Sequence, residues 1–345
     1  MSFKEEKREK IKRYLLDKVD MNQRDLAKRT ADTFEISLNT VYRYLRELEE
    51  QGIIEKKDGR YVFVENVKTV CLKLSQGERL EEDNIYLKYI DKYVNSLSDN
   101  VQRIWQYSFT EMMNNAIEHS EAALVTIMVV QNYLNTAIFI VDNGIGIFRK
   151  IKEYYSYASL DDAVNELFKG KLTTDKKNHS GEGIFFTSRI LDRFAAVSDG
   201  KIFSHDKYTE LLRNLEDIKA LKDWKERKGT VVYMELSNYS NKILKEVFDM
   251  FADVDGGFTR THIPIKNIYE MYPVSRSQAK RLCHRFENFK EIELDFQGIS
   301  EIGQGFAHEI FVVFQNEHKD VKLVPTHMTK EVERMIYHVT STSLH

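Results

Sequence analysis

Residues 111–119 read Glu-Met-Met-Asn-Asn-Ala-Ile-Glu-His and lie in a predicted helix over residues 104–120, where apolar side chains form one broad face. Glu111, Asn115 and His119 are four residues apart, so they project along a single stripe of that helix. An acid followed by an amide at this spacing suits a hydrated Mg²⁺, with the amide oxygen as ligand and the carboxylate orienting water or acting as a base. The same spacing also occurs on the wet face of ordinary amphipathic helices.

Two predicted strands, over residues 122–130 and 136–141, follow this helix, and the second runs directly into Asp-Asn-Gly-Ile-Gly at residues 142–146. Glycines here let the backbone turn tightly beside a flat ligand. A buried carboxylate at Asp142 can accept the exocyclic amino proton of adenine and would discriminate against a base that lacks this donor. A simple turn before a helix is the other interpretation.

A polar stretch over residues 148–179 leads to a second pair of glycines. It contains Lys171 and Thr174 and is followed by Gly-Glu-Gly at residues 181–183, which opens a predicted helix. Glycines at a helix N-terminus expose backbone N–H groups and so favour phosphate. Farther along the chain, Thr230 follows a glycine and begins a predicted strand, where it is placed to hydrogen-bond the base side of a pocket.

The order of these motifs is Glu-x-x-x-Asn, Asp-x-Gly-x-Gly, Gly-x-Gly and Gly-Thr, and together they resemble the GHKL family of ATPases over roughly residues 80–237. The resemblance implies a Bergerat-type α/β sandwich that binds ATP and Mg²⁺. Glu111 would be the catalytic acid, and Asn115 would be the metal ligand. The cofactor-binding residues would be Asn115, Asp142, Gly144, Gly146, Lys171, Thr174, Gly181, Gly183 and Thr230.

Within the GHKL ATPases, residues 114–120 are most similar to the anti-sigma-factor serine kinases. Residues 66–100 are too short for a histidine-kinase dimerisation helix and contain no His, so a histidine kinase is disfavoured. An insertion over residues 204–227 departs from the family core and reads as a solvated helical excursion or a partner surface. A weak ATPase and a serine/threonine protein kinase both stay open, as does a protein that only senses ATP.

The N-terminal 65 residues predict three helices and a hairpin. The first helix covers residues 4–18, the second follows a cap at Asn22, and the third follows a cap at Ser37. Asp-Gly at residues 58–59 is the pair favoured in a tight turn between two strands.

This arrangement resembles the winged helix-turn-helix domain of bacterial transcription regulators. The resemblance implies that the third helix enters a major groove and that the basic hairpin meets phosphates. The DNA-binding residues would be Asn39, Thr40, Arg43, Arg46, Lys56, Lys57 and Arg60. A winged domain that binds protein instead is the alternative.

Strands and helices alternate after residue 258, with a basic amphipathic helix predicted over residues 275–289, and this alternation predicts a small α/β domain. The run from Glu293 to Gly303 resembles the STAS domains of anti-sigma-factor antagonists, over residues 258–340. In those antagonists a serine at the start of the next helix is phosphorylated, whereas residues 303–305 here read Gly-Gln-Gly and Ser300 is the nearest hydroxyl. Phosphorylation of this domain is therefore left open.

The whole sequence predicts an α+β multidomain protein with a winged helix at residues 1–65, a GHKL domain at 66–240 and a STAS-like domain at 258–345. Its 345 residues carry a net charge of −3 and two separated cysteines, which argues against a disulfide framework. No apolar run is long enough to span a bilayer, so we expect a cytoplasmic protein without membrane contact. The expected cofactors are ATP and Mg²⁺. The expected partners are double-stranded DNA, a second copy in a homodimer and, as a further option, a regulatory protein.

The leading hypothesis is a bacterial transcriptional or signalling regulator in which ATP orders a lid over residues 148–180, changes its packing against the C-terminal domain and so controls DNA or partner binding. Two alternatives are a protein kinase that acts on a partner in trans, with Glu111 as base, and a sensor component of a stress or phage-defence operon.

Overall fold

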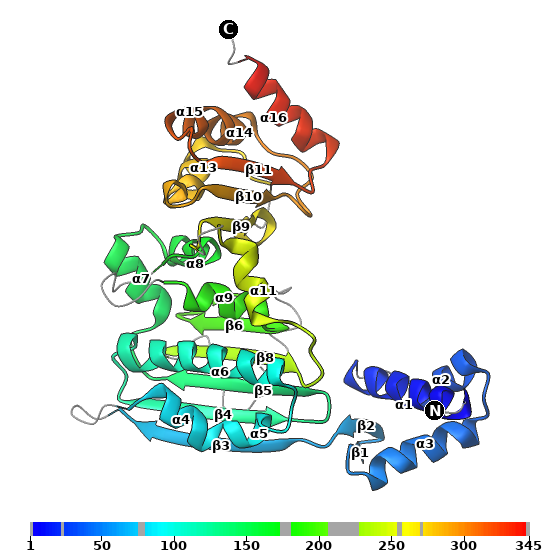
Figure 1. Cartoon of the computed structure of the whole chain (residues 1–345). Coiled ribbons are helices and arrows are strands. Elements are labelled where there is room, and N and C mark those ends of the chain that lie inside the picture. Colours follow the sequence, from blue (N-terminus) through cyan, green and yellow to red (C-terminus); the bar gives the residue numbers. More distant parts are fainter. Residues whose placement is uncertain are drawn as a thin grey trace. The chain divides into compact units, whose positions relative to one another are not determined.

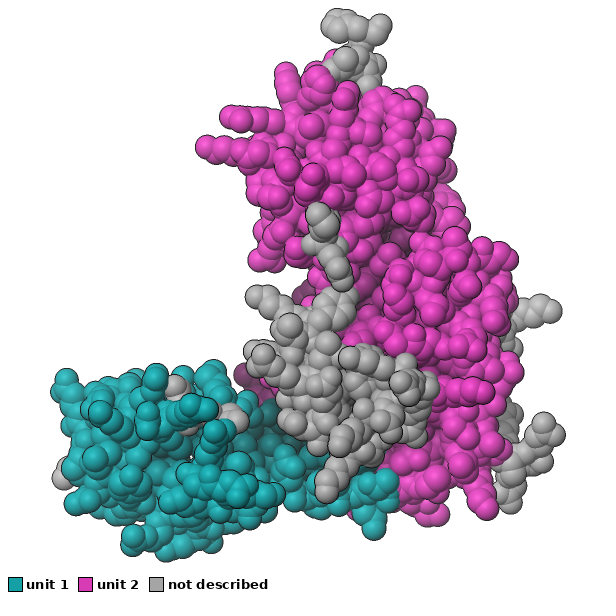
Figure 2. All heavy atoms as spheres, turned by 180° about the vertical axis from the view of Figure 1, so that it is seen from behind, with its two compact units in different colours: residues 1–69, 128–137 teal, residues 70–127, 138–345 magenta. Residues whose placement is uncertain are grey.

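The computed structural model describes residues 3–21, 24–74, 80–172, 181–205, 228–253, 257–269 and 272–342. By its contacts the chain forms two compact units, residues 1–69 with 128–137 and residues 70–127 with 138–345 (Figure 2). Helices and strands are both abundant, and the predicted α+β multidomain fold class is confirmed. Most of the predicted ATP-binding region and all of the predicted STAS-like region lie in the second unit. None of the described helices is long and apolar enough to cross a membrane.

Three helices and a hairpin build the first unit. They are α1 (Phe3–Asp20), α2 (Leu26–Phe34), α3 (Leu38–Glu50), β1 (Ile54–Lys57) and β2 (Arg60–Phe63), with the two strands antiparallel. Leu15, Val41, Leu45 and Ile54 are buried at its core, as the apolar stripe of the third helix predicts.

The local signals for α3 and the hairpin are confirmed. The Ser37 hydroxyl accepts a hydrogen bond from the Thr40 backbone N–H at 3.2 Å, so it caps α3. Asp58 and Gly59 have φ of 49° and 80°, as a tight hairpin turn requires. Asn22, the predicted cap of the second helix, lies outside the described residues, and the residue that precedes α2 is Asp25, whose side chain makes no cap hydrogen bond.

A six-stranded sheet follows, in the order β3-β4-β5-β8-β6-β7. Its strands are β3 (Asn66–Lys73), β4 (Leu124–Gln131), β5 (Asn135–Asp142), β6 (Arg193–Ser198), β7 (Lys201–Phe203) and β8 (Thr230–Ser237). Strands β7 and β8 both pair with β6 in antiparallel register. Helices α4 (Glu82–Tyr89), α5 (Asp91–Val94), α6 (Asp99–Asn114) and α9 (Gly183–Ile190) lie over one face of the sheet (Figure 1).

Two predictions in this region need correction. The helix predicted over residues 104–120 begins earlier, at Asp99, and its last turn, Asn115–His119, is π-helical. The polar stretch over residues 148–179, for which no helix was predicted, contains α7 (Ile147–Tyr155) and α8 (Leu160–Lys169). Both helices bury an apolar face, but the many polar residues among the apolar ones made this helical pattern hard to recognise in the sequence. Of the predicted insertion, residues 206–227 lie outside the described part of the chain.

The C-terminal part contains a three-stranded parallel sheet in the order β11-β10-β9, as alternating strands and helices predicted. The strands are β9 (Arg260–Pro264), β10 (Glu291–Asp295) and β11 (Lys322–Thr326). The helices are α11 (Leu244–Phe251), α12 (Ile265–Ile268), α13 (Arg276–Cys283), α14 (Gln304–His308), α15 (Gln315–Glu317) and α16 (Lys330–Thr342), with a π-helical segment at Glu309–Phe314 and a 3₁₀ turn at Phe286–Asn288.

The basic helix predicted over residues 275–289 is shorter than expected. Ser275 caps it in a capping box with Gln278, but it ends at Cys283. Arg285 follows in the left-handed region with φ of 67° and is only 8% exposed. Its side chain is therefore not part of a solvated basic face.

Candidate functional sites

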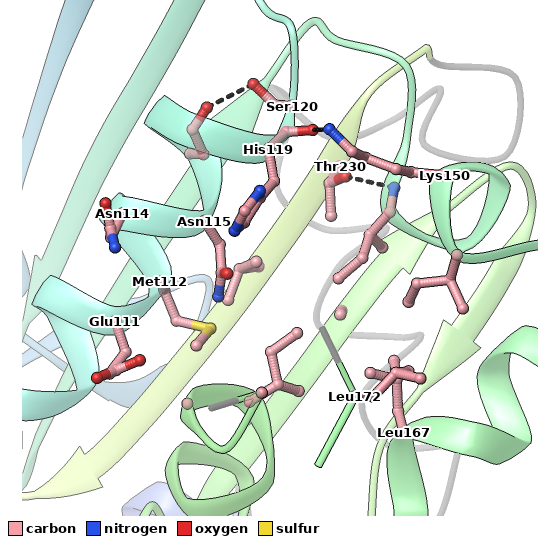
Figure 3. Close-up of a pocket in the computed structure, with 18 of the residues that line it drawn as sticks. Glu111, Met112, Asn114, Asn115, His119, Ser120, Lys150, Leu167, Leu172 and Thr230 are labelled. Carbon is pink, nitrogen blue, oxygen red and sulfur yellow. Dashed lines mark hydrogen bonds between the residues drawn. The ribbon is translucent and has the colours of Figure 1, made fainter. Parts of the chain in front are cut away.

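Described residues of the second unit enclose a cavity of about 300 Å³, a size within the range of small-molecule sites. Helix α6 and its π-helical turn form one side, and strands β5, β6 and β8 contribute to another (Figure 3). The strands supply apolar side chains, namely Ile140, Phe194, Ala196 and Val232. A flat apolar surface with a few polar groups around it suits a planar, partly hydrophobic ligand.

Asp142 supplies a buried carboxylate to the cavity. It ends β5, is 5% exposed, and its Oδ1 accepts backbone N–H groups of Gly144 at 2.8 Å and Thr230 at 3.2 Å. These donors fix the orientation of the carboxylate. The Thr230 hydroxyl in turn accepts the Ile147 N–H at 3.0 Å, so Thr230 ties β8 to the start of α7 while it lines the cavity (Figure 3).

Glycines make this arrangement sterically possible. A Cβ on Gly144 would lie 2.0 Å from the Ser120 carbonyl oxygen, and one on Gly229 would lie 2.1 Å from that of Asp142. Gly146, with φ of 89°, lines the cavity directly. Gly144 was predicted to contact the cofactor, but the structure packs it against Ser120 outside the cavity lining.

Glu111, Asn115 and His119 all line the cavity, from one side of the α6 segment (Figure 3). Asn115 and His119 belong to the π-helical turn, a feature that often marks functional sites because it alters the register of side chains. Gly183, at the start of α9, lies close to Glu111, since a Cβ there would be 2.1 Å from the Glu111 Oε2. The acid and the second glycine pair therefore meet at one end of the cavity.

The remaining cofactor predictions have different outcomes. Gly181 lines the cavity beside Leu172, whose N–H donates to the Gly181 carbonyl at 3.1 Å. Lys171 does not line it, because its Nζ donates to the Asn288 carbonyl at 2.8 Å and lies over the Phe289 ring. Thr174 lies outside the described residues.

Sequence reasoning missed Lys150. This residue of α7 lines the cavity, and its Nζ donates to the His119 carbonyl at 2.7 Å (Figure 3). Its position one helical turn after Gly146 was the available signal. Among the described lining residues, Lys150 is the only lysine or arginine against the carboxylates of Glu111, Asp142 and Glu182. The described lining is thus net acidic.

The described lining of the cavity offers few side chains that could bind a metal ion directly. Among the described residues, no group of three or more His, Cys, Asp or Glu side chains is arranged to hold a metal ion. Mg²⁺ does not need such a group, because it keeps several waters and takes phosphate oxygens with one or two protein ligands. The oxygen donors of Asn115 and Glu111 are of the kind that this mode of binding uses.

The second candidate site is a nucleic-acid interface on α3 and the hairpin. Asn39, Arg43 and Arg46 are exposed on α3, opposite its buried stripe. Thr40 is half-buried, and its hydroxyl is 2.9 Å from that of Ser37. The predicted wing residues Lys56, Lys57 and Arg60 are exposed around the turn. The cations therefore remain accessible, as phosphate contacts require.

Two exposed apolar residues of α3 were also missed. Leu38 is 46% and Tyr42 is 49% exposed, although the helix has a well-filled core face. Their positions outside the Val41, Leu45 and Leu48 stripe were the sequence signal. Apolar side chains on a groove-facing helix can contact thymine methyl groups and sugars.

Comparison with known families supports both ends of the chain. Residues 4–55 match the family model described as winged helix-turn-helix DNA-binding. Residues 278–333 match the model of a STAS-like domain of unknown function (DUF4325). A comparison with curated proteins found no match. The winged-helix and STAS-like predictions are therefore confirmed. A DNA-binding domain of this type indicates a regulator. Neither matched range includes residues that line the cavity.

Proposed function

We propose that this protein is a DNA-binding regulator whose central cavity binds ATP with Mg²⁺ in the manner of the GHKL ATPases. The observation that carries the proposal is convergence: seven of the predicted residues come from four separate segments of the chain and line one cavity. These residues are Glu111, Asn115, Asp142, Gly146, Gly181, Gly183 and Thr230. A chance set of polar and glycine residues spread over 120 positions would not be expected to meet in this way.

The two ends of the cavity suit chemically different parts of ATP. The adenine ring fits the apolar surface of the strands, where its amino group donates to Asp142. The phosphates fit the other end, near Gly181 and Gly183, where glycines leave backbone N–H groups accessible. Mg²⁺ would offset the phosphate charge, which the net acidic lining does not offset by itself. Binding should therefore depend strongly on the metal.

Asp142→Asn tests adenine recognition with little change in shape. The amide keeps an oxygen for the N–H groups of Gly144 and Thr230, but it removes one acceptor that faces the base. We expect the affinity for Mg–ATP to fall about 10- to 100-fold, the loss expected for a hydrogen bond to a charged group. Inosine triphosphate lacks the amino group, so its affinity should change much less.

Asp295→Asn is the matched control, because Asp295 is also buried at the end of a strand but lies outside the cavity lining. Equal ATP and inosine triphosphate binding by the unmodified protein would contradict the proposed role of Asp142. No binding of Mg–ATP at all would contradict the proposed function of the cavity.

The DNA half of the proposal is tested by selecting genomic fragments with no nucleotide, with ADP and with Mg–ATP, across a salt series. Selective fragments whose retention depends on nucleotide would support an ATP-controlled regulator. Retention that disappears at modest salt without sequence preference would leave only backbone electrostatics. Incubation of the unmodified protein and of the Glu111→Gln variant with labelled ATP distinguishes a protein that only senses ATP from one that hydrolyses it or transfers its phosphoryl group.

A further inference from the structure

Residues 169–172 connect the end of α8 to the cavity, and they are held by the C-terminal, STAS-like part of the chain. Gly170 and Leu172 line the cavity, whereas Lys169 and Lys171 point away from it toward C-terminal residues. Gly170 and Lys171 both have positive φ, 82° and 51°, so the backbone turns sharply here. A segment in this conformation persists only when its surroundings hold it.

Arg285 is the main anchor. One guanidinium nitrogen donates to the carbonyl of Gly170 at 3.1 Å and to that of Lys171, while the other donates to Glu166 Oε2 at 3.0 Å. Lys171 supplies a second anchor through its bond to the Asn288 carbonyl. Two consecutive backbone carbonyls, those of the cavity-lining Gly170 and of Lys171 next to it, are therefore fixed from the C-terminal domain.

A buried ionic cluster sets the position of Arg285. Glu166 is 3% and Lys169 is 1% exposed, with the Lys169 Nζ 2.6 Å from Glu166 Oε1. The same ammonium donates to the carbonyls of Arg281 and His284 at 3.2 and 2.8 Å. Apolar replacements of buried ion pairs are often neutral or stabilising, so such a cluster is better explained by orientation than by stability.

Aromatic packing leaves this segment little room to move. A Cβ on Gly170 would lie 2.7 Å from the Phe258 ring and 2.8 Å from that of Phe185. The Thr261 hydroxyl of β9 donates to the Lys169 carbonyl at 2.8 Å. A shift of the C-terminal sheet therefore has to move residues 169–172, and through the Leu172 to Gly181 hydrogen bond it reaches the glycine pair.

We propose that Arg285 is a positioning residue for the nucleotide cavity, through which the STAS-like domain and the phosphate end of the cavity control each other. This inference rests on the proposed ATP site. Coupling between two binding sites is reciprocal, so a ligand of the STAS-like domain that changes nucleotide affinity must have its own affinity changed by nucleotide by the same factor. A protein partner docked on the STAS-like domain would then change nucleotide affinity without touching the nucleotide.

The test compares Arg285→Met, Arg285→Lys and Lys171→Met with the unmodified full chain. Lys290→Met is the control, because it removes a surface ion pair with Asp253 in the same part of the chain. We expect Arg285→Met to weaken Mg–ATP binding about tenfold, Arg285→Lys to recover part of the loss, and Lys290→Met to have no effect. Lys171→Met should weaken binding less, and it decides the matter if Arg285→Met does not fold.

Amide exchange supplies a readout that a merely structural role would not change. In the unmodified protein, Mg–ATP should slow exchange in peptides covering residues 284–289, and Arg285→Met should abolish this response while binding remains measurable at higher ATP. Unchanged Mg–ATP affinity in the folded Arg285 and Lys171 variants would overturn the inference, as would the absence of any response at residues 284–289. Failure of the unmodified protein to bind Mg–ATP would instead overturn the proposed function.

Discussion

Single glycines show how closely the cavity depends on backbone contact. Gly229 has φ of 94°, and a Cβ there would lie 2.1 Å from the carbonyl oxygen of Asp142. Gly52 also has a positive φ, 67°, but nothing lies within 4 Å of its Cβ position. Alanine substitutions at these two positions therefore distinguish the free-energy cost of backbone strain alone from the cost of strain together with a steric clash.

We expect Gly52→Ala to lower the free energy of unfolding by about 1–2 kcal/mol, the cost of the left-handed conformation alone. Gly229→Ala should cost more, because a backbone oxygen has to move, and it should also weaken Mg–ATP binding. Urea unfolding and nucleotide titration measure the two effects. Equal destabilisation by both substitutions would contradict the close contact at Asp142.

The buried acid Glu166 gives a pH-dependent prediction. Burial raises its pKa, but the charges and hydrogen bonds of Lys169, His284 and Arg285 more than offset this and lower the pKa to about 2. A carboxyl with a depressed pKa stabilises the fold above its ordinary value near 4.5, and this stability is lost as the pH falls toward 2.

Glu166→Gln should therefore flatten the dependence of unfolding free energy on pH between about 4.5 and 2. At neutral pH it should destabilise the fold by about 3–5 kcal/mol, because it leaves buried cations without their partner. Glu291→Gln removes a surface pair with Lys322 and should cost no more than about 1 kcal/mol. If the unfolding free energy of Glu166→Gln depended on pH as that of the unmodified protein does, Glu166 would not be the source of this pH dependence.

At the scale of elements, helix α3 and the hairpin are expected to play different parts in DNA binding. Arg43 lies on the exposed face of α3, where an arginine can read a base edge, whereas Lys56 and Lys57 lie next to the hairpin turn. Base contacts provide specificity, and phosphate contacts provide salt-dependent affinity.

Arg43→Ala should cost about 1–3 kcal/mol on the preferred sequence and reduce discrimination between sequences. Lys56→Ala or Lys57→Ala should weaken binding to all sequences and reduce the slope of log affinity against log salt by about 1. The exposed Lys319, outside the winged helix, serves as the control. Binding of a selected fragment and a random fragment across a salt series measures these effects, and identical behaviour of the α3 and hairpin variants would argue against the division.

At the scale of the whole molecule, the two proposed sites belong to different units, the winged helix to the first and the cavity to the second. If nucleotide controls DNA binding, the coupling free energy must be the same in both directions, typically about 1–3 kcal/mol.

We therefore expect the selected DNA to change Mg–ATP affinity by the factor by which Mg–ATP changes DNA affinity. Titration of each ligand in the presence and absence of the other measures both factors. Asp142→Asn should still bind DNA but lose the dependence on nucleotide. No change in either titration would show that the two sites are not coupled.

The sequence by itself determined the local features of this protein. The Ser37 cap, the Asp58-Gly59 turn and the apolar stripe of α3 are set by neighbouring residues, and they were predicted because short-range geometry dictates them. The small C-terminal α/β domain was likewise predicted from the alternation of strands and helices, whereas the parallel pairing of its strands came from the structure.

Only the tertiary structure decided which residues share a site. Gly144 and Lys171 carry suitable chemistry, but packing directs one against Ser120 and the other toward Asn288. Lys150 lines the cavity because α7 folds beside the π-helical turn, and Arg285 leaves its expected helix to reach Glu166. Such positions depend on contacts between residues far apart in the chain, and a local sequence pattern contains no record of them.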